Sequence, residues 1–112
     1  MIDLDYLIGV NEYVCSLVGE PCVLINENNL LSALSVQGWY DDPRLLASAL
    51  IRSLTIGHGF RDGNKRTAAI VGAAILDYTC DEYTMADCIL RIAMGELRDV
   101  EEIAGILYPK ET

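Results

Sequence analysis

The sequence of 112 residues has few of the features that most often identify a protein's chemistry. It contains a single histidine, and its four cysteines include no pair at the two-residue spacing of zinc sites and redox motifs. No apolar run reaches the roughly 18 residues of a membrane span, and Met1–Asp5 lacks the basic start of a secretory signal. We therefore expect reduced, structural thiols in a cytoplasmic protein that has no membrane partner.

Basic residues are also scarce, since eight Lys and Arg stand against 17 Asp and Glu, for a net charge of −9. Nucleic-acid binding needs clustered basic residues that neutralise phosphates, so we expect no direct nucleic-acid binding. Half of the basic residues nevertheless lie in one short stretch, Arg52–Arg66. Such a local excess of positive charge is able to hold an anion on a protein that is acidic overall.

Strand-like alternation of polar and apolar residues is almost absent, whereas helical spacing of apolar residues recurs along the chain. Capping and breaking residues divide this pattern into six expected helices, with a short extended segment at 23–25. The helices are expected from Asp3 to Gly19, from Asn28 or Asn29 to Leu34, from Asp42 to Gly57, from about Gly63–Lys65 to Leu76, from Thr84 to Met94 and from Asp99 to Tyr108.

The segment Ala68–Leu76 is apolar on every side and rich in Ala and Gly. A helix without a polar face is typical of a position buried on all sides. The hydrophobic fraction of 52% is enough to fill a core around it. We therefore expect a compact all-α domain over residues 1–112, with about six helices around a central buried helix.

One run, HGFRDGNKRTA from His58 to Ala68, interrupts this apolar pattern just before the expected central helix. The N-terminus of a helix binds anions through its unpaired N–H groups and the positive end of its dipole. Gly63 allows a ligand to approach the backbone closely. Lys65 and Arg66 would occupy the first turn, where an exposed cation costs about 0.3–1 kcal/mol unless an anion is bound. The run therefore predicts a phosphate site.

Two further side chains of this run suit phosphate chemistry. His58 is the residue type that most often serves as a general base near neutral pH. Asp62 is able either to cap the following helix or to hold Mg²⁺ together with phosphate oxygens, and the sequence leaves both roles open. Phe60 is the only phenylalanine of the chain and is expected to anchor the loop in the core.

The run resembles the signature of the Fic/Doc family, H-x-F-x-[DE]-[GA]-N-[GK]-R. Every position is matched, by His58, Phe60, Asp62, Gly63, Asn64, Lys65 and Arg66. The resemblance implies a small all-helical domain with the motif between two core helices. It also implies a transferase that moves a nucleotide or a phosphate-containing group onto a protein hydroxyl, with ATP as co-substrate and Mg²⁺ as cofactor.

The resemblance assigns a role to each residue of the motif. His58 would be the catalytic base that takes the proton from the target hydroxyl, and Asp62 would hold Mg²⁺ on the phosphates. The phosphate- and nucleotide-binding residues would be Gly63, Asn64, Lys65 and Arg66. The backbone amides of the first two, with the Asn64 side chain, would form an anion hole.

Two positions distinguish the branches of the family. Fic enzymes that transfer AMP have a glycine where this chain has Lys65 and a second arginine where it has Ala69. Lys65 resembles the Doc branch, whose members transfer the γ-phosphate to a translation elongation factor and are inhibited by an antitoxin. We therefore expect a Doc-type toxin acting on a Ser/Thr hydroxyl of a target protein. AMP transfer and a catalytically silent binding protein are the alternatives.

Three other segments invite a functional interpretation. Ser16–Pro21, SLVGEP, is close to the family's inhibitory form [ST]-x-x-x-E-[GN] but ends in proline. A separate antitoxin is therefore favoured over self-inhibition by Glu20. The pair Trp39–Tyr40 is expected to be a packed turn rather than a substrate platform, and Asp81–Tyr83 is expected to be a loop.

Overall fold

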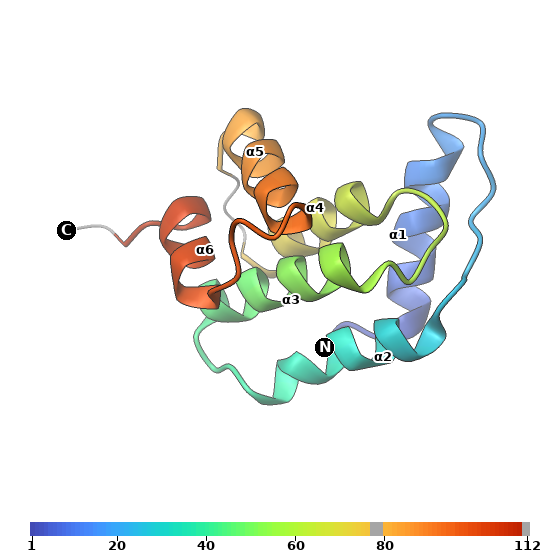
Figure 1. Cartoon of the computed structure of the whole chain (residues 1–112). Helices are drawn as coiled ribbons and strands as arrows, with labels where there is room; N and C mark the ends of the chain where they lie inside the picture. The colour runs from blue at the N-terminus through green and yellow to red at the C-terminus, as the bar shows by residue number, and fades with distance from the viewer. Residues whose placement is uncertain (77–79, 111–112) are drawn as a thin grey trace.

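The computed structural model describes residues 1–76 and 80–110 (Figure 1). Its elements in chain order are α1 (Leu4–Ser16), α2 (Glu27–Ser35), the 3-10 helix η1 (Val36–Gly38), α3 (Pro43–Gly57), α4 (Asn64–Ile75), α5 (Glu82–Ala93) and α6 (Val100–Leu107). The only β-type pairing among these residues is an isolated antiparallel bridge between Leu24 and Phe60. The prediction of an all-α fold with six helices is confirmed.

Side-chain caps determine where most of these helices begin. Five of the six α-helices in the described chain start after an Asp or Asn whose side chain accepts a backbone N–H of the first turn. The capping residues are Asp3, Asn26, Asp42, Asp81 and Asp99. Because Asn26 and Asp81 are the caps, α2 and α5 begin earlier than predicted. The predicted loop at Asp81–Tyr83 is therefore wrong, since α5 has begun by Glu82.

The central helix is α3, one helix earlier in the chain than predicted. It packs against α2, α4, α5 and α6, and the side chains of Ala47–Ile51 are buried. Helix α4 packs against α1, α3 and α5, but leaves Ile70 37% exposed. The prediction that α4 is buried on all sides is therefore wrong. The exposed positions of α4 are Lys65, Arg66, Ile70 and Ala74, so its apolar run continues onto a face that is not buried.

A glycine allows α3 and α4 to pack closely. A Cβ atom at Gly72 would lie 2.4 Å from Cδ1 of Ile51 and 3.3 Å from the hydroxyl oxygen of Tyr108. Ile51 is fully buried, so it has little room to move away. The loop of the His58–Ala68 run joins α3 to α4, so this contact sets how closely the two helices that flank the loop approach each other.

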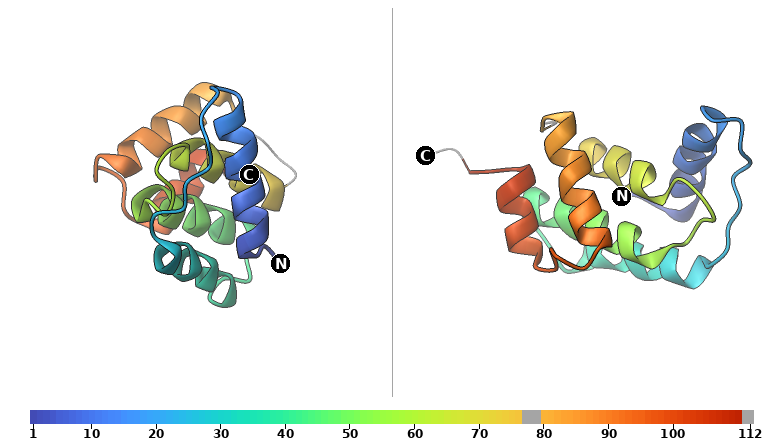
Figure 2. Two further views of the ribbon diagram at one scale, coloured as in Figure 1. Left: turned by 90° about the vertical axis from the view of Figure 1, so that its right-hand side faces the viewer. Right: turned by 45° about the horizontal axis from the view of Figure 1, so that its top comes forward.

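The helices are arranged so that the two ends of the molecule differ. Helix α1 and the motif loop lie at one end, and α6 lies at the other (Figures 1 and 2).

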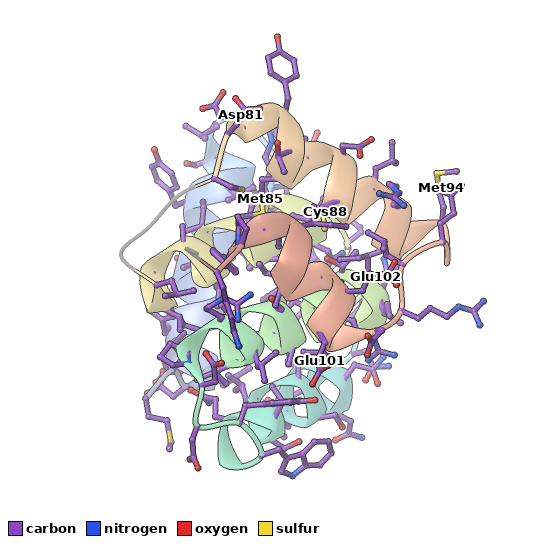
Figure 3. All side chains as sticks on the ribbon, turned by 90° about the vertical axis from the view of Figure 1, so that its left-hand side faces the viewer. Asp81, Met85, Cys88, Met94, Glu101 and Glu102 are labelled. Atoms are coloured by element: carbon purple, nitrogen blue, oxygen red, sulfur yellow. The ribbon has the colours of Figure 1, made fainter. Side chains whose placement is uncertain are left out.

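On α6, Glu101 and Glu102 are exposed, as a solvated helix face requires (Figure 3). Among residues 1–76 and 80–110, no helix is sufficiently long and apolar to cross a membrane.

The cysteines are free thiols, as predicted: Cys15, Cys22, Cys80 and Cys88. Burial raises the pKa of Cys88 to about 11. This thiol therefore stays protonated at neutral pH, where the thiolate is the reactive form. Cys88 packs among the core side chains.

Replacement of Gly72 by alanine tests the close packing of α3 on α4. We expect Gly72→Ala to lower the free energy of unfolding by about 1–2 kcal/mol, because overpacking exceeds the gain in helix propensity. Gly105 in α6 is the matched control, since a Cβ atom there meets no atom within 4 Å. Gly105→Ala should raise the free energy of unfolding by about 0.5–1 kcal/mol. Urea denaturation measures both, and stabilisation by both substitutions would contradict the packing.

Candidate active site

The motif forms a short loop whose two ends have left-handed backbone conformations. His58 follows the last residue of α3 with φ 47° and ψ 52°, and Gly63 precedes α4 with φ 78°. A non-glycine residue in this region costs on the order of 1–3 kcal/mol and persists only where surrounding contacts hold it. The backbone therefore positions His58, whose side chain is exposed at the surface.

An extended segment before α2 runs beside the loop and fixes its path. The N–H groups of Ile25 and Asn26 both donate to the Gly59 carbonyl, with N···O distances of 2.9 and 3.0 Å. The N–H of Arg61 donates to the Val23 carbonyl at 2.9 Å. These bonds confirm the short extended segment that the sequence predicts.

Asn64 holds the loop from inside. Its Nδ2 donates to the Phe60 carbonyl at 2.7 Å, and its Oδ1 accepts the Phe60 N–H at 3.1 Å. Phe60 is 1% exposed, which confirms its predicted role as an anchor. Because both polar atoms of the Asn64 side chain are bound to Phe60, this side chain maintains the loop. Its contribution to an anion hole stays a prediction.

The buried side chain of Asn11 in α1 supports the loop, a role that was not predicted from the sequence. The side chain is fully buried, and its Nδ2 donates to the Asp62 carbonyl at 2.8 Å and to Thr67 Oγ1 at 3.3 Å. A Cβ atom at Gly63 would lie 3.0 Å from the same Nδ2. The sequence feature that could have indicated this role is the position of Asn11, an amide one turn after Leu7 on the buried face of α1.

The N-terminus of α4 is left open toward the loop. The alternative in which Asp62 caps α4 is wrong, because Gly63 is the capping residue and has no side chain to accept a bond. The Asp62 carboxylate instead accepts a hydrogen bond from Arg61 Nε at 3.3 Å. The first N–H groups of α4 therefore lack a side-chain acceptor. Lys65 and Arg66 are exposed in the same turn, so an anion bound there would satisfy both the N–H groups and the two cations.

A pocket of about 360 Å³ brings the predicted residues together. It contains every predicted site residue: His58, Asp62, Gly63, Asn64, Lys65 and Arg66. The opposite wall comes from α1 and the turn after it, through Val14, Cys15 and Val18. The volume lies within the roughly 300–1,000 Å³ of pockets that take small molecules. The pocket thus brings together an imidazole, a carboxylate and a helix N-terminus without a side-chain cap.

Asp62 fits a magnesium ion that arrives with a phosphate ligand. Its side chain is 53% exposed in the pocket and is not used as a cap. In the part of the chain that the structure describes, no three or more His, Cys, Asp or Glu side chains are grouped to hold a metal. Mg²⁺ commonly takes one or two carboxylates and completes its shell with phosphate oxygens and water. A single carboxylate beside the uncapped N-terminus of α4 would suit this mode of binding.

Glu20 lies at the rim of the site, after the end of α1. Its Oε2 is 3.9 Å from Nη2 of Arg61, and both side chains are about half exposed. An exposed pair of this kind contributes only about 0–1 kcal/mol. The Glu20 N–H donates to the Cys15 carbonyl at 2.9 Å, which closes the helix end. Glu20 is therefore a helix-end residue, as predicted.

Trp39 differs from the prediction of a packed turn. Tyr40 packs against the core, but Trp39 is 74% exposed. The difference arises because Val36 and Tyr40 already fill this corner of the core. Trp39 instead borders a separate groove between α2 and α3.

A family model described as the Fic/DOC family matches residues 24–76, which include the whole motif. The match supports the resemblance to this family, and the six-helix fold agrees with it. Members of the family are typically transferases that act on protein hydroxyls. Comparison with the curated proteins finds no match.

Two bidentate amide pairs allow the role of Asn64 to be tested. The Gln37 side chain binds Ile2 in the same way as Asn64 binds Phe60: its Oε1 accepts the Ile2 N–H at 2.9 Å, and its Nε2 donates to the Ile2 carbonyl at 2.8 Å. Gln37 does not line the motif pocket. We expect Asn64→Ala and Gln37→Ala each to lower the free energy of unfolding by about 1–3 kcal/mol. Only Asn64→Ala should weaken the binding of inorganic tripolyphosphate, by tenfold or more. Calorimetric titration of the two folded variants measures this, and equal affinities would exclude a role for Asn64 in shaping the anion site.

Proposed function

We propose that this chain is a Fic-type transferase that moves a phosphate-containing group from ATP to a Ser/Thr hydroxyl of a target protein. One observation carries the proposal: a single pocket contains His58, Asp62 and the uncapped N-terminus of α4 with its two cations. Phosphoryl transfer depends mainly on positioning and on stabilisation of negative charge. This pocket provides groups for both.

In the proposed reaction, the N–H groups at the start of α4 hold the reacting phosphate, and Arg66 neutralises part of its charge. The target hydroxyl oxygen forms a bond to the γ-phosphorus while the bond from this phosphorus to the ADP oxygen breaks. His58 accepts the hydroxyl proton, and ADP leaves with the electron pair. A magnesium ion bound with the nucleotide would neutralise further phosphate charge beside Asp62.

Two residues favour transfer of the γ-phosphate over transfer of AMP. Lys65 places a long cation in the pocket wall, where the AMP-transferring relatives have a glycine. Ala69 follows one turn later and provides no second arginine to hold the terminal phosphate of a nucleotide in the AMP-transfer orientation. We therefore propose a Doc-type toxin kinase, with a translation elongation factor as the class of target.

We further propose that a separate antitoxin, rather than Glu20, restrains this activity. Glu20 follows the end of α1 and pairs with Arg61, which is not one of the signature positions. Both partners are half exposed, so the pair holds Glu20 only weakly at the rim. Such a contact is too weak to block a nucleotide.

Transfer of label from ATP to proteins of a cell extract tests the proposed reaction. We expect label from the γ-position, a mass gain of one phosphate on the target, and growth arrest on expression. His58→Asn should reduce transfer by about 10²- to 10⁴-fold, because it removes the base. Asparagine tolerates the left-handed conformation, so the free energy of unfolding should change by less than about 0.5 kcal/mol.

Each alternative has its own outcome in this experiment. Label from the α-position, with a mass gain of one AMP, would exclude the kinase and support nucleotidyl transfer. If wild type and His58→Asn arrest growth equally and neither labels a protein, the chain is a catalytically silent binding protein.

Glu20→Gly tests the proposed source of inhibition. We expect the isolated variant to transfer phosphate at the wild-type rate, because the exposed contact with Arg61 does not restrain the site. A rise of tenfold or more over wild type would show that the chain inhibits itself. Rates of label transfer by the two purified proteins provide the comparison.

A further inference from the structure

Helix α5 exposes a line of large apolar side chains on the side that faces away from the core. The side that packs against the rest of the chain is buried through Cys88, Ile89 and Ile92. On the outer side, Tyr83 is 85% exposed and Leu90 is 49% exposed, and Met94, which follows the end of the helix, is 62% exposed. Figure 3 shows Met94 projecting away from the other helices.

The spacing of these three residues places them on one face. Tyr83, Leu90 and Met94 are seven and four positions apart, and with about 3.6 residues per turn they follow one line along the helix. Single exposed apolar side chains are normal on a protein surface, whereas a contiguous group indicates an interaction site. We call this line of three side chains the outer face of α5.

One edge of the outer face is charged and the other is small. Asp87 and Arg91 lie one turn apart along the first edge, and the exposed Ala86 and Ala93 lie along the second. Arg91 Nε is 3.8 Å from Oε2 of Glu96, and the two side chains are 40% and 53% exposed. An exposed pair contributes only about 0–1 kcal/mol, so Arg91 is able to bind a second carboxylate.

The outer face is complementary to itself when two copies meet in antiparallel orientation. The pairs Asp87–Arg91 and Tyr83–Met94 have nearly the same midpoint along α5, beside Ile89. A two-fold axis through that midpoint, perpendicular to the helix, brings Asp87 of each copy to Arg91 of the other. It also brings Tyr83 to Met94, a contact between an aromatic ring and a thioether that is favourable. Parallel helices would instead bring Asp87 against Asp87.

We propose that the outer face of α5 binds the same face of a second copy of this chain, with the two helices antiparallel. A single helix of 12 residues buries less surface than the roughly 800 Å² per partner of a stable interface, so the dimer is weak and transient. None of the residues that line the motif pocket belongs to α5, so both pockets stay open in the dimer. The dimer is therefore independent of the proposed function.

Sedimentation equilibrium of the whole chain, from about 1 μM to about 1 mM, tests the dimer. Each copy has a net charge of −9, so the measurement uses about 0.15 M salt, which limits the screening length to about 8 Å. We expect a Kd on the order of 10 μM for wild type. Leu90→Glu should raise this Kd at least tenfold, because it places a charge in the apolar contact.

Leu31→Glu is the matched control, since Leu31 of α2 is a helical leucine with a similar exposed fraction, 46%. This variant should form the dimer as wild type does. A wild-type chain that stays monomeric at 1 mM would overturn the proposal, as would equal effects of the two substitutions. The outer face of α5 would then be left to a different protein.

Charge reversal tests the antiparallel arrangement. Asp87→Arg and Arg91→Asp each bring like charges together twice in the dimer, so each variant alone should associate at least tenfold more weakly than wild type. In an equimolar mixture every Arg meets an Asp of the other variant, and the mixture should associate about as tightly as wild type. A mixture that associates no more tightly than the separate variants would overturn the arrangement. Circular dichroism checks that both variants keep the wild-type helix content.

Discussion

A partly buried hydrogen bond from Asn11 to the Asp62 carbonyl joins α1 to the motif loop across 51 positions of sequence. The bond fixes the backbone immediately before α4, and Gly63 fits against the same amide group. Asn64 provides the second constraint by binding both backbone groups of Phe60. Together with the buried Phe60 side chain and the backbone bonds from the segment before α2, these two amide side chains hold the loop and hence determine where His58 and the open helix end lie.

The site combines several locally unfavourable features. His58 has a left-handed backbone, α4 lacks a side-chain cap, and two cations stand at the positive end of its dipole. Each feature costs stability in the free protein. A bound anion would remove two of these costs, and the buried amide bonds offset the third. A loop that keeps a locally unfavourable backbone and charge arrangement because other contacts hold it is typical of a functional site rather than of a structural turn.

Much of this organisation can be predicted from local signals. The caps, the glycines and the apolar spacing predict six helices, and the motif predicts the residues that line the pocket. Features that depend on tertiary packing cannot be predicted in this way. The sequence does not show that α3 rather than α4 is enclosed, because both helices have long apolar faces. Nor does it show that Asn11 lies under the loop, since its position on the apolar face of α1 indicates burial but not the group that it binds.

The position of Asn11 on α1 limits how readily the motif can be transferred to another protein as an isolated segment. The segment that resembles the Fic/DOC family, residues 24–76, contains the whole motif but not the side chain beneath it. Grafted onto another scaffold, this segment would keep the reactive groups and lose the contact that fixes the backbone before α4. Exchange of the motif between proteins therefore requires the exchange of the buried face of this helix as well.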